Sequence, residues 1–123
     1  MTPTPVVSGP PGVLTRRQIR ERTIRALATR AQSNSARRRQ ELLEYVVSIN
    51  MGIANGLVSR YNGRRLGTED LQKVLRAALT RAVRDFEPEG RDEFLSYALP
   101  IVRRELGIHL RDRARTVRPP LGS

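Results

Sequence analysis

Residues 68–118 contain the clearest structural pattern of the chain and read TEDLQKVLRAALTRAVRDFEPEGRDEFLSYALPIVRRELGIHLRDRARTVR. Its first part repeats apolar residues at intervals of three and four, which predicts an amphipathic helix over 69–86 with one buried face. Thr68 is expected to cap the start of this helix, and Pro88 with Gly90 is expected to end it. The positions expected to be buried are Leu71, Val74, Leu75, Ala78, Leu79, Ala82, Val83 and Phe86.

A second helix follows the turn at Pro88 and Gly90 and is rich in arginine. Its arginines are Arg103, Arg104, Arg111, Arg113 and Arg115, with Arg118 just beyond. This half of the stretch therefore looks suited to an anionic partner.

Two further helices are expected before this stretch. Thr15 and Gln18 form a capping-box pattern, which predicts a helix from about 15 to 32. Its apolar stripe is thin, so it either docks loosely or folds fully only against a partner. The inner positions are expected to be Ile19, Ala26, Leu27 and Ala31, and the exposed ones Arg16, Arg17, Arg20, Arg22, Arg25 and Arg30.

The longest periodic run covers 36–61, between a cap offered by Ser33-Asn34-Ser35 and a stop at Asn62-Gly63. Gly52 and Gly56 lie four residues apart in this run, a spacing that permits close approach of another helix. The polar context favours a local packing device over a dimer face in a membrane. The apolar face is expected to hold Leu42, Leu43, Val46, Ile49, Met51, Ile53, Ala54, Leu57, Val58 and Tyr61.

These elements predict an all-α fold, a compact bundle of three to four helices over residues 14–118. Residues 1–13 hold four of the eight prolines and are expected to form a disordered tail, and 119–123 a short C-terminal tail. No apolar run approaches the length of a membrane span and no signal pattern begins the chain, so a soluble, cytoplasmic protein is expected.

The charge balance points to an acidic or polyanionic partner. The 23 basic residues, 22 of them arginine, exceed the 12 acids and give a net charge of +11. Arginine pairs bidentately with phosphate and with carboxylate, so nucleic acid and an acidic protein surface both fit, beside the simpler alternative of a solvated surface. There is no cysteine, which excludes a disulfide framework and a thiolate metal site.

The same stretch resembles conserved region 2 of sigma-70 family RNA polymerase sigma factors, closest to the stress-response and sporulation type. The resemblance rests on Glu69-Asp70-Leu71, Ala82-Val83, Asp85-Phe86-Glu87-Pro88, Phe94, Ser96-Tyr97-Ala98, Pro100, Glu105, His109, Arg111-Asp112, Val117-Arg118 and Pro120. It extends back through 57–61 and Arg64-Arg65-Leu66 and covers about 75 residues. It implies a role in transcription initiation.

The resemblance implies that the exposed side of helix 69–86 docks on the clamp helices of the RNA polymerase core. The corresponding positions are Asp70, Lys73, Val74, Arg76 and Thr80. Lys73 stands where the family has Gln, and Leu75 and Ala78 where it has Gly, so polymerase binding is weakened or redirected, unless this is an ordinary solvated face.

The second helix corresponds to the part of the family that recognises and melts the promoter −10 element. The implied DNA-binding residues are Phe94, Ser96, Tyr97, Arg103, Arg104, His109 and Arg111. Tyr97 would stack on a flipped base and the arginines would hold phosphates. Phe94 and Tyr97 could equally be core residues, and Leu110 and Arg115 replace family aromatics, so the melting apparatus looks incomplete.

Catalysis is not expected. His109 is the single histidine, and no triad, phosphate loop or metalloprotease pattern occurs, so neither an enzyme nor a cofactor is predicted. The chain also ends before a region 4, so it is either a fragment or a single-domain regulator. Two functions stay open: a sigma-like initiation protein, or a sigma mimic that binds an anti-sigma factor or other regulator without initiating. General nucleic-acid binding by charge is a weaker third.

Overall fold

The computed structural model describes residues 13–90 and 93–117, with side chains through residue 112. The described residues form four helices and no strand, which confirms the all-α prediction. The tails expected at 1–13 and 119–123 fall, apart from Val13, outside the described residues, as do Arg118 and the side chains of Arg113 and Arg115. The helices are α1 (Arg16–Gln32), α2 (Ala36–Asn62), α3 (Thr68–Asp85) and α4 (Phe94–Val117).

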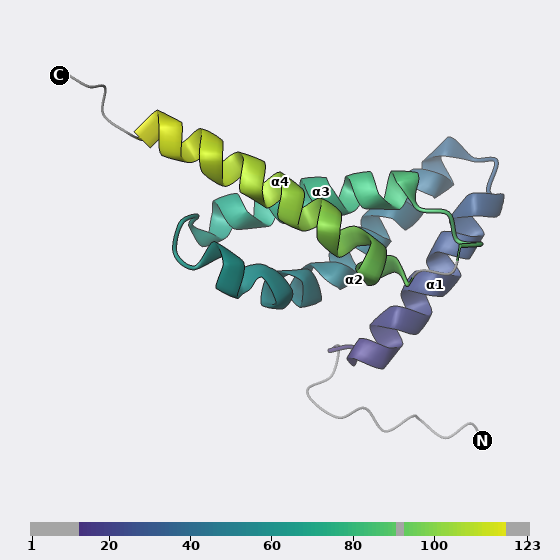
Figure 1. The fold of residues 1–123 in the computed structure, drawn as a ribbon. Coiled ribbons are helices and arrows are strands. Elements are labelled where there is room, and N and C mark those ends of the chain that lie inside the picture. The colour runs from purple at the N-terminus through teal and green to yellow at the C-terminus, as the bar shows by residue number, and fades with distance from the viewer. Residues whose placement is uncertain (1–12, 91–92, 118–123) are drawn as a thin grey trace, which may run out of the picture.

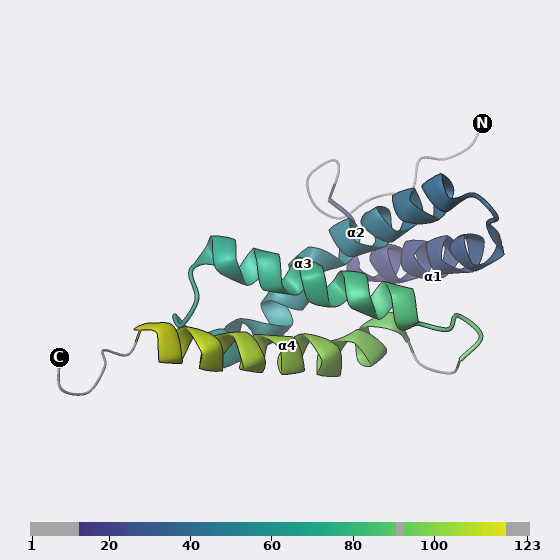
Figure 2. The same cartoon turned by 90° about the horizontal axis from the view of Figure 1, so that it is seen from above.

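The four helices form two antiparallel pairs, α1 beside α2 and α3 beside α4, and α2 joins the pairs by packing against α3 (Figures 1 and 2). The α1–α2 turn and the end of α3 lie at one end of the molecule, and the end of α4 lies at the other. The core runs between the pairs, and its largest fully buried side chains include Leu75, Leu79 and Leu106.

Helix α1 begins at the predicted capping box. Thr15 Oγ1 accepts a hydrogen bond from the Gln18 backbone N–H at 3.1 Å, and Gln18 Oε1 accepts one from the Thr15 N–H at 2.9 Å. Ala26 and Leu27 are buried as expected. The prediction was wrong for Ala31, which is exposed one residue before the helix ends and the chain turns towards α2.

Two side chains of α1 also depart from their predicted burial. Thr23 was not expected inside but is buried, because it receives a hydrogen bond from α2. Arg30 was expected to be exposed but is half-buried, because it lies where three helix ends meet.

Helix α2 is capped at its start by Ser35, whose side chain accepts from the Arg38 N–H. Its C-cap is Gly63, the one glycine with positive φ in the described residues. Leu57 and Tyr61 were expected inside, yet they are 40% and 48% exposed. The first turn of α1 lies beside Ile53, and Leu57 and Tyr61 come after Ile53 on α2. Helix α1 therefore does not cover them. Periodicity placed them on the right side of the helix but did not show how far the neighbouring helix extends.

Gly52 and Gly56 do not mediate the close helix approach that their spacing predicted. Both are exposed, and a Cβ atom built at either position would meet nothing within 4 Å. The two glycines therefore leave an open strip along the outside of α2.

Helix α2 is also long and apolar enough, by length and composition alone, to cross a membrane. This corrects the expectation that no run approaches that length. Of its most apolar window, 44% is buried inside the bundle, and the core helix of a soluble protein passes the same test.

Residues 68–117 form α3 and α4 as predicted, with two shifts at the ends of α3. Gly67 is the N-cap, and its carbonyl accepts from the Leu71 N–H at 2.9 Å, so Thr68 is the first helical residue and makes no side-chain cap. The helix ends at Asp85, and Phe86 is already extended with ψ of 133°. Helix α4 continues through the exposed Pro100, which lies within its first two turns.

Candidate functional site

The outer side of α3 carries most of the residues assigned to polymerase binding. Lys73 and Arg76 are exposed, and Asp70 and Thr80 are half-buried. Val74 is different: it is 8% exposed and belongs to the core. This confirms the burial predicted from the apolar spacing and contradicts the resemblance-based assignment of Val74 to the exposed side. It sits on the same helical side as Leu71 and Leu75, which pack inwards.

The aromatic residues at the start of α4 pack inwards rather than outwards. Phe94 is 3% exposed and belongs to the hydrophobic core. Its ring meets that of Phe86 edge-on, with centroids 5.6 Å apart, and Phe86 meets Tyr97 at 5.4 Å. The sequence left open whether Phe94 contacts DNA or belongs to the core, and its burial shows that it belongs to the core. Tyr97 is half-buried against that core, and Ser96 is exposed.

The basic residues of α4 line a groove against the end of α2, which we name the arginine groove. Its volume is about 680 Å³. Three of the predicted DNA-binding residues, Arg103, Arg104 and Arg111, come together there, whereas the exposed His109 does not line it. The full lining is Tyr61, Arg65, Arg103, Arg104, Gly107, Ile108, Leu110 and Arg111, with no acidic residue.

Tyr61 projects from α2 into the arginine groove and crosses to α4. A Cβ atom at Gly107 would lie 3.2 Å from the Tyr61 hydroxyl oxygen, so the absence of a side chain at 107 makes room for the phenol. Because 48% of Tyr61 is exposed, the ring remains available on the surface. The arginine groove thus combines an accessible aromatic ring with four guanidinium groups.

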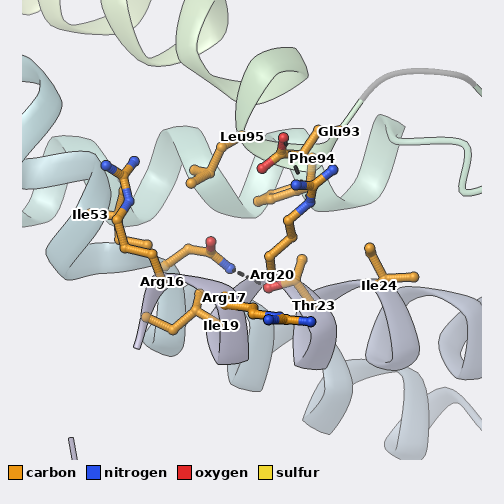
Figure 3. Close-up of a pocket in the computed structure, with 11 residues that line it drawn as sticks. Arg16, Arg17, Ile19, Arg20, Thr23, Ile24, Ile53, Glu93, Phe94 and Leu95 are labelled. Atoms are coloured by element: carbon orange, nitrogen blue, oxygen red, sulfur yellow. Dashed lines mark hydrogen bonds and ion pairs between the residues drawn. The ribbon is translucent and has the colours of Figure 1, made fainter. Parts of the chain in front are cut away.

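A second hollow of about 400 Å³, which we name the amide pocket, lies where α1, α2 and the start of α4 meet (Figure 3). Arg20 extends from α1 towards Glu93, which it pairs with at 3.8 Å. Arg16 and Arg17 also line the pocket, so its lining has a positive net charge. Its apolar lining consists of Ile19, Ile24, Ile53, Phe94 and Leu95.

A buried amide also lines the amide pocket. Asn50 is 1% exposed, and its Nδ2 donates to Thr23 Oγ1 at 2.9 Å and to the Val46 carbonyl at 2.8 Å. Both amide hydrogens are therefore used, and the bond to a carbonyl fixes which end of the amide is nitrogen. Asn50 Oδ1 accepts no hydrogen bond from the described residues, so an acceptor and the Thr23 hydroxyl donor remain for a ligand.

Sequence reasoning missed four of these residues. Tyr61 was assigned to the core, Arg65 was noted only within the resemblance, and Asn50 and Thr23 were not singled out. The available signal was polarity: Asn50 interrupts the apolar face of 36–61, and a buried amide requires hydrogen-bond partners.

No metal site accompanies these surfaces. Within residues 13–90 and 93–117, no group of three or more histidine, aspartate and glutamate side chains is placed to hold a metal ion.

The comparison with known protein families agrees with this arrangement. The family model for Sigma-70 region 2 matches residues 48–116, which cover the second half of α2, all of α3 and nearly all of α4. Helix α1 lies outside the match. No solved structure matches this chain. The matched segment is more than half of the sequence and contains both the outer side of α3 and the arginine groove, and the chain therefore belongs to the Sigma-70 region 2 family.

Proposed function

We propose that this chain is a sigma-like transcription initiation protein that binds RNA polymerase core through the outer side of α3 and single-stranded −10 DNA through the arginine groove. Membership of the Sigma-70 region 2 family supports a role in transcription initiation and implies binding to the polymerase core. The family is not enzymatic, which agrees with the absence of a catalytic pattern in the sequence. Its members are typically cytoplasmic, and we place this chain there too.

The DNA-binding proposal rests on one observation, that arginine side chains and an exposed tyrosine line the same groove. Single strands are held by cationic side chains along the backbone and by aromatic faces under the bases. Arg103, Arg104 and Arg111 supply the first, and Tyr61 supplies the second from the facing helix. We therefore assign the stacking role to Tyr61 rather than to Tyr97, whose ring packs against Phe86.

The amide pocket extends this surface. Ile53 lines the amide pocket and Tyr61 the arginine groove, with Leu57 between them at four-residue spacing on the same side of α2. Eight residues of helix span about 12 Å, so one strand can reach both places. An apolar lining with one amide acceptor and one hydroxyl donor suits an unstacked base, which presents both kinds of group at its edge.

The DNA-binding proposal is tested by fluorescence anisotropy with a labelled single-stranded −10 oligonucleotide. Arg103→Gln and Arg104→Gln should each weaken binding and make it less dependent on salt, because each removes a phosphate contact. Arg25→Gln is the matched control, since Arg25 is exposed on α1 and lines neither the arginine groove nor the amide pocket. Equal weakening by all three variants would reduce the proposal to binding by net charge.

The polymerase proposal is tested by recovering partners of the tagged full chain from its own cell extract, with nuclease present. Core polymerase subunits are expected, and Arg76→Glu should reduce their recovery because the reversed charge lies on the exposed side of α3. Arg25→Glu reverses the same charge on α1 and should leave recovery unchanged. Unchanged recovery with Arg76→Glu would remove α3 from the interface.

A second function, a sigma mimic that binds an anti-sigma factor or other regulator, is favoured by one observation. The aromatic side chains expected to melt the promoter are packed into the protein, with Phe94 buried and Tyr97 against Phe86. Recovery of a small regulatory protein without polymerase would select this function over initiation.

A further inference from the structure

Three arginines from three different helices gather at the end of the bundle opposite the end of α4. Arg30 is in the last turn of α1, Arg39 is near the start of α2, and Arg84 is in the last turn of α3. The α1–α2 turn and the end of α3 lie together at this end in both views (Figures 1 and 2). We name these residues the arginine triad.

Hydrogen bonds fix two members of the arginine triad beside each other. The Arg30 carbonyl accepts from the Ser33 N–H at 3.1 Å, and the Ser33 carbonyl accepts from Arg39 Nη1 at 2.8 Å. The guanidinium of Arg39 is thus held over the turn that directly follows Arg30. The pKa of Arg30 is lowered by burial and then by the charges of Arg39 and Arg84, which agrees with the position of the three helix ends at this end of the bundle (Figures 1 and 2).

The arginine triad has no acidic partner among the described residues, and one of its donors is unused. Arg30 Nε is buried and has no hydrogen-bond partner among the described residues, which is the one such side-chain atom found there. None of the three arginines takes part in an ion pair within residues 13–90 and 93–117. Like charges held together around a buried, unused donor are unfavourable unless an anion joins them.

We propose that Arg30, Arg39 and Arg84 form a phosphate-binding site at this end of the bundle. A phosphate group carries more oxygen acceptors and more charge than a carboxylate, so it better matches three guanidinium groups that reach it from three helices. Its source is either a free phosphate ester, such as a nucleotide, or the backbone of a nucleic-acid strand. The site is separate from the arginine groove, which is formed by the end of α2 and by α4.

The direct test follows the arginine Nε–Hε signals of the full chain by two-dimensional NMR. Sodium phosphate is added to one sample and sodium chloride, at equal ionic strength, to the other. Phosphate should shift the Arg30 signal to a saturable limit and raise the midpoint of thermal unfolding, whereas chloride should do neither. A signal that does not move, or that moves equally with chloride, would overturn the proposal.

Variants distinguish a built site from diffuse binding. Arg84 is exposed and its side chain makes no ion pair among the described residues, so Arg84→Gln should fold and weaken phosphate binding about tenfold. Arg25→Gln, with the same change of charge on an exposed position of α1, should leave it unchanged. Equal weakening by both variants, or no weakening by Arg84→Gln, would show that no such site exists.

The two sources of phosphate are separated by competition. A mononucleotide and a short oligonucleotide without a terminal phosphate are each added to the phosphate-bound chain. Displacement by the oligonucleotide would assign the site to a nucleic-acid backbone, and displacement by the mononucleotide alone would assign it to a free phosphate ester. If neither ligand displaces phosphate, both assignments are overturned. The test of the arginine groove stays independent, because it reads different residues.

Discussion

Replacing Tyr61 with alanine should weaken binding of single-stranded −10 DNA without unfolding the protein. Stacking of one base on an aromatic side chain contributes about 1 to 3 kcal/mol, which corresponds to a roughly 5- to 150-fold increase in the dissociation constant. Tyr61 is 48% exposed and lies outside the hydrophobic core, so loss of its ring should cost the fold little stability.

The assay is fluorescence anisotropy with the labelled oligonucleotide, beside a thermal unfolding curve for each variant. Tyr61→Phe should bind almost as well as the original chain, because the ring is kept. Tyr45→Ala is the matched control, since Tyr45 is a second exposed tyrosine on α2, hydrogen-bonded by Arg22 at 3.3 Å and distant from the arginine groove. A change below about twofold for Tyr61→Ala, or an equal loss for Tyr45→Ala, would refute the stacking role.

Three further substitutions test the fold and the amide pocket. Gly52→Ala and Gly56→Ala should each stabilise the protein by about 0.5 to 1 kcal/mol, because both positions are helical and open; chemical denaturation measures this, and a loss of stability would reveal an unseen contact. Asn50→Ala should destabilise the protein by about 1 to 3 kcal/mol, because two buried hydrogen bonds are lost, and should also weaken −10 DNA binding. Unchanged DNA affinity in this variant would exclude the amide pocket from the DNA interface. Tyr97→Ala should lower the unfolding midpoint because its ring packs against Phe86, and an unchanged midpoint would contradict that packing.

The helices themselves could be predicted from local signals. The capping box at Thr15, the cap at Ser35 and the stop at Gly63 lie where the sequence placed them. Seven apolar positions of the stretch from Leu71 to Val83 are all buried, since a strong three-and-four spacing fixes which side of a helix faces the core. These features depend only on residues within a few turns of each other.

The surfaces could be predicted only in part, because they depend on where neighbouring helices begin and end. Arg103 and Arg111 were assigned to DNA because they lie on the arginine-rich helix that the resemblance matches to the promoter-recognising part of the family. Tyr61 was assigned to the core, since its periodicity cannot show that α1 stops before reaching it. For Val74, the apolar spacing correctly predicted burial, and only the position taken from the family resemblance placed this residue on the exposed side.

Helix α1 determines what the amide pocket can hold. The family match begins at residue 48, so Asn50 and Ile53 belong to the matched part, whereas Arg20 and Thr23 come from α1 outside it. Without Thr23, one of the two amide hydrogens of Asn50 would have no acceptor. The hydrogen bond from Asn50 to Thr23 supplies that acceptor and also holds α1 against α2. Thr23 therefore supplies the hydroxyl donor of the amide pocket, and its contact with Asn50 also holds α1 in place. Helix α1 in turn brings Arg16, Arg17 and Arg20 to the pocket. Under the proposed function, the part of this surface most able to set ligand preference therefore lies in α1, outside the matched residues 48–116.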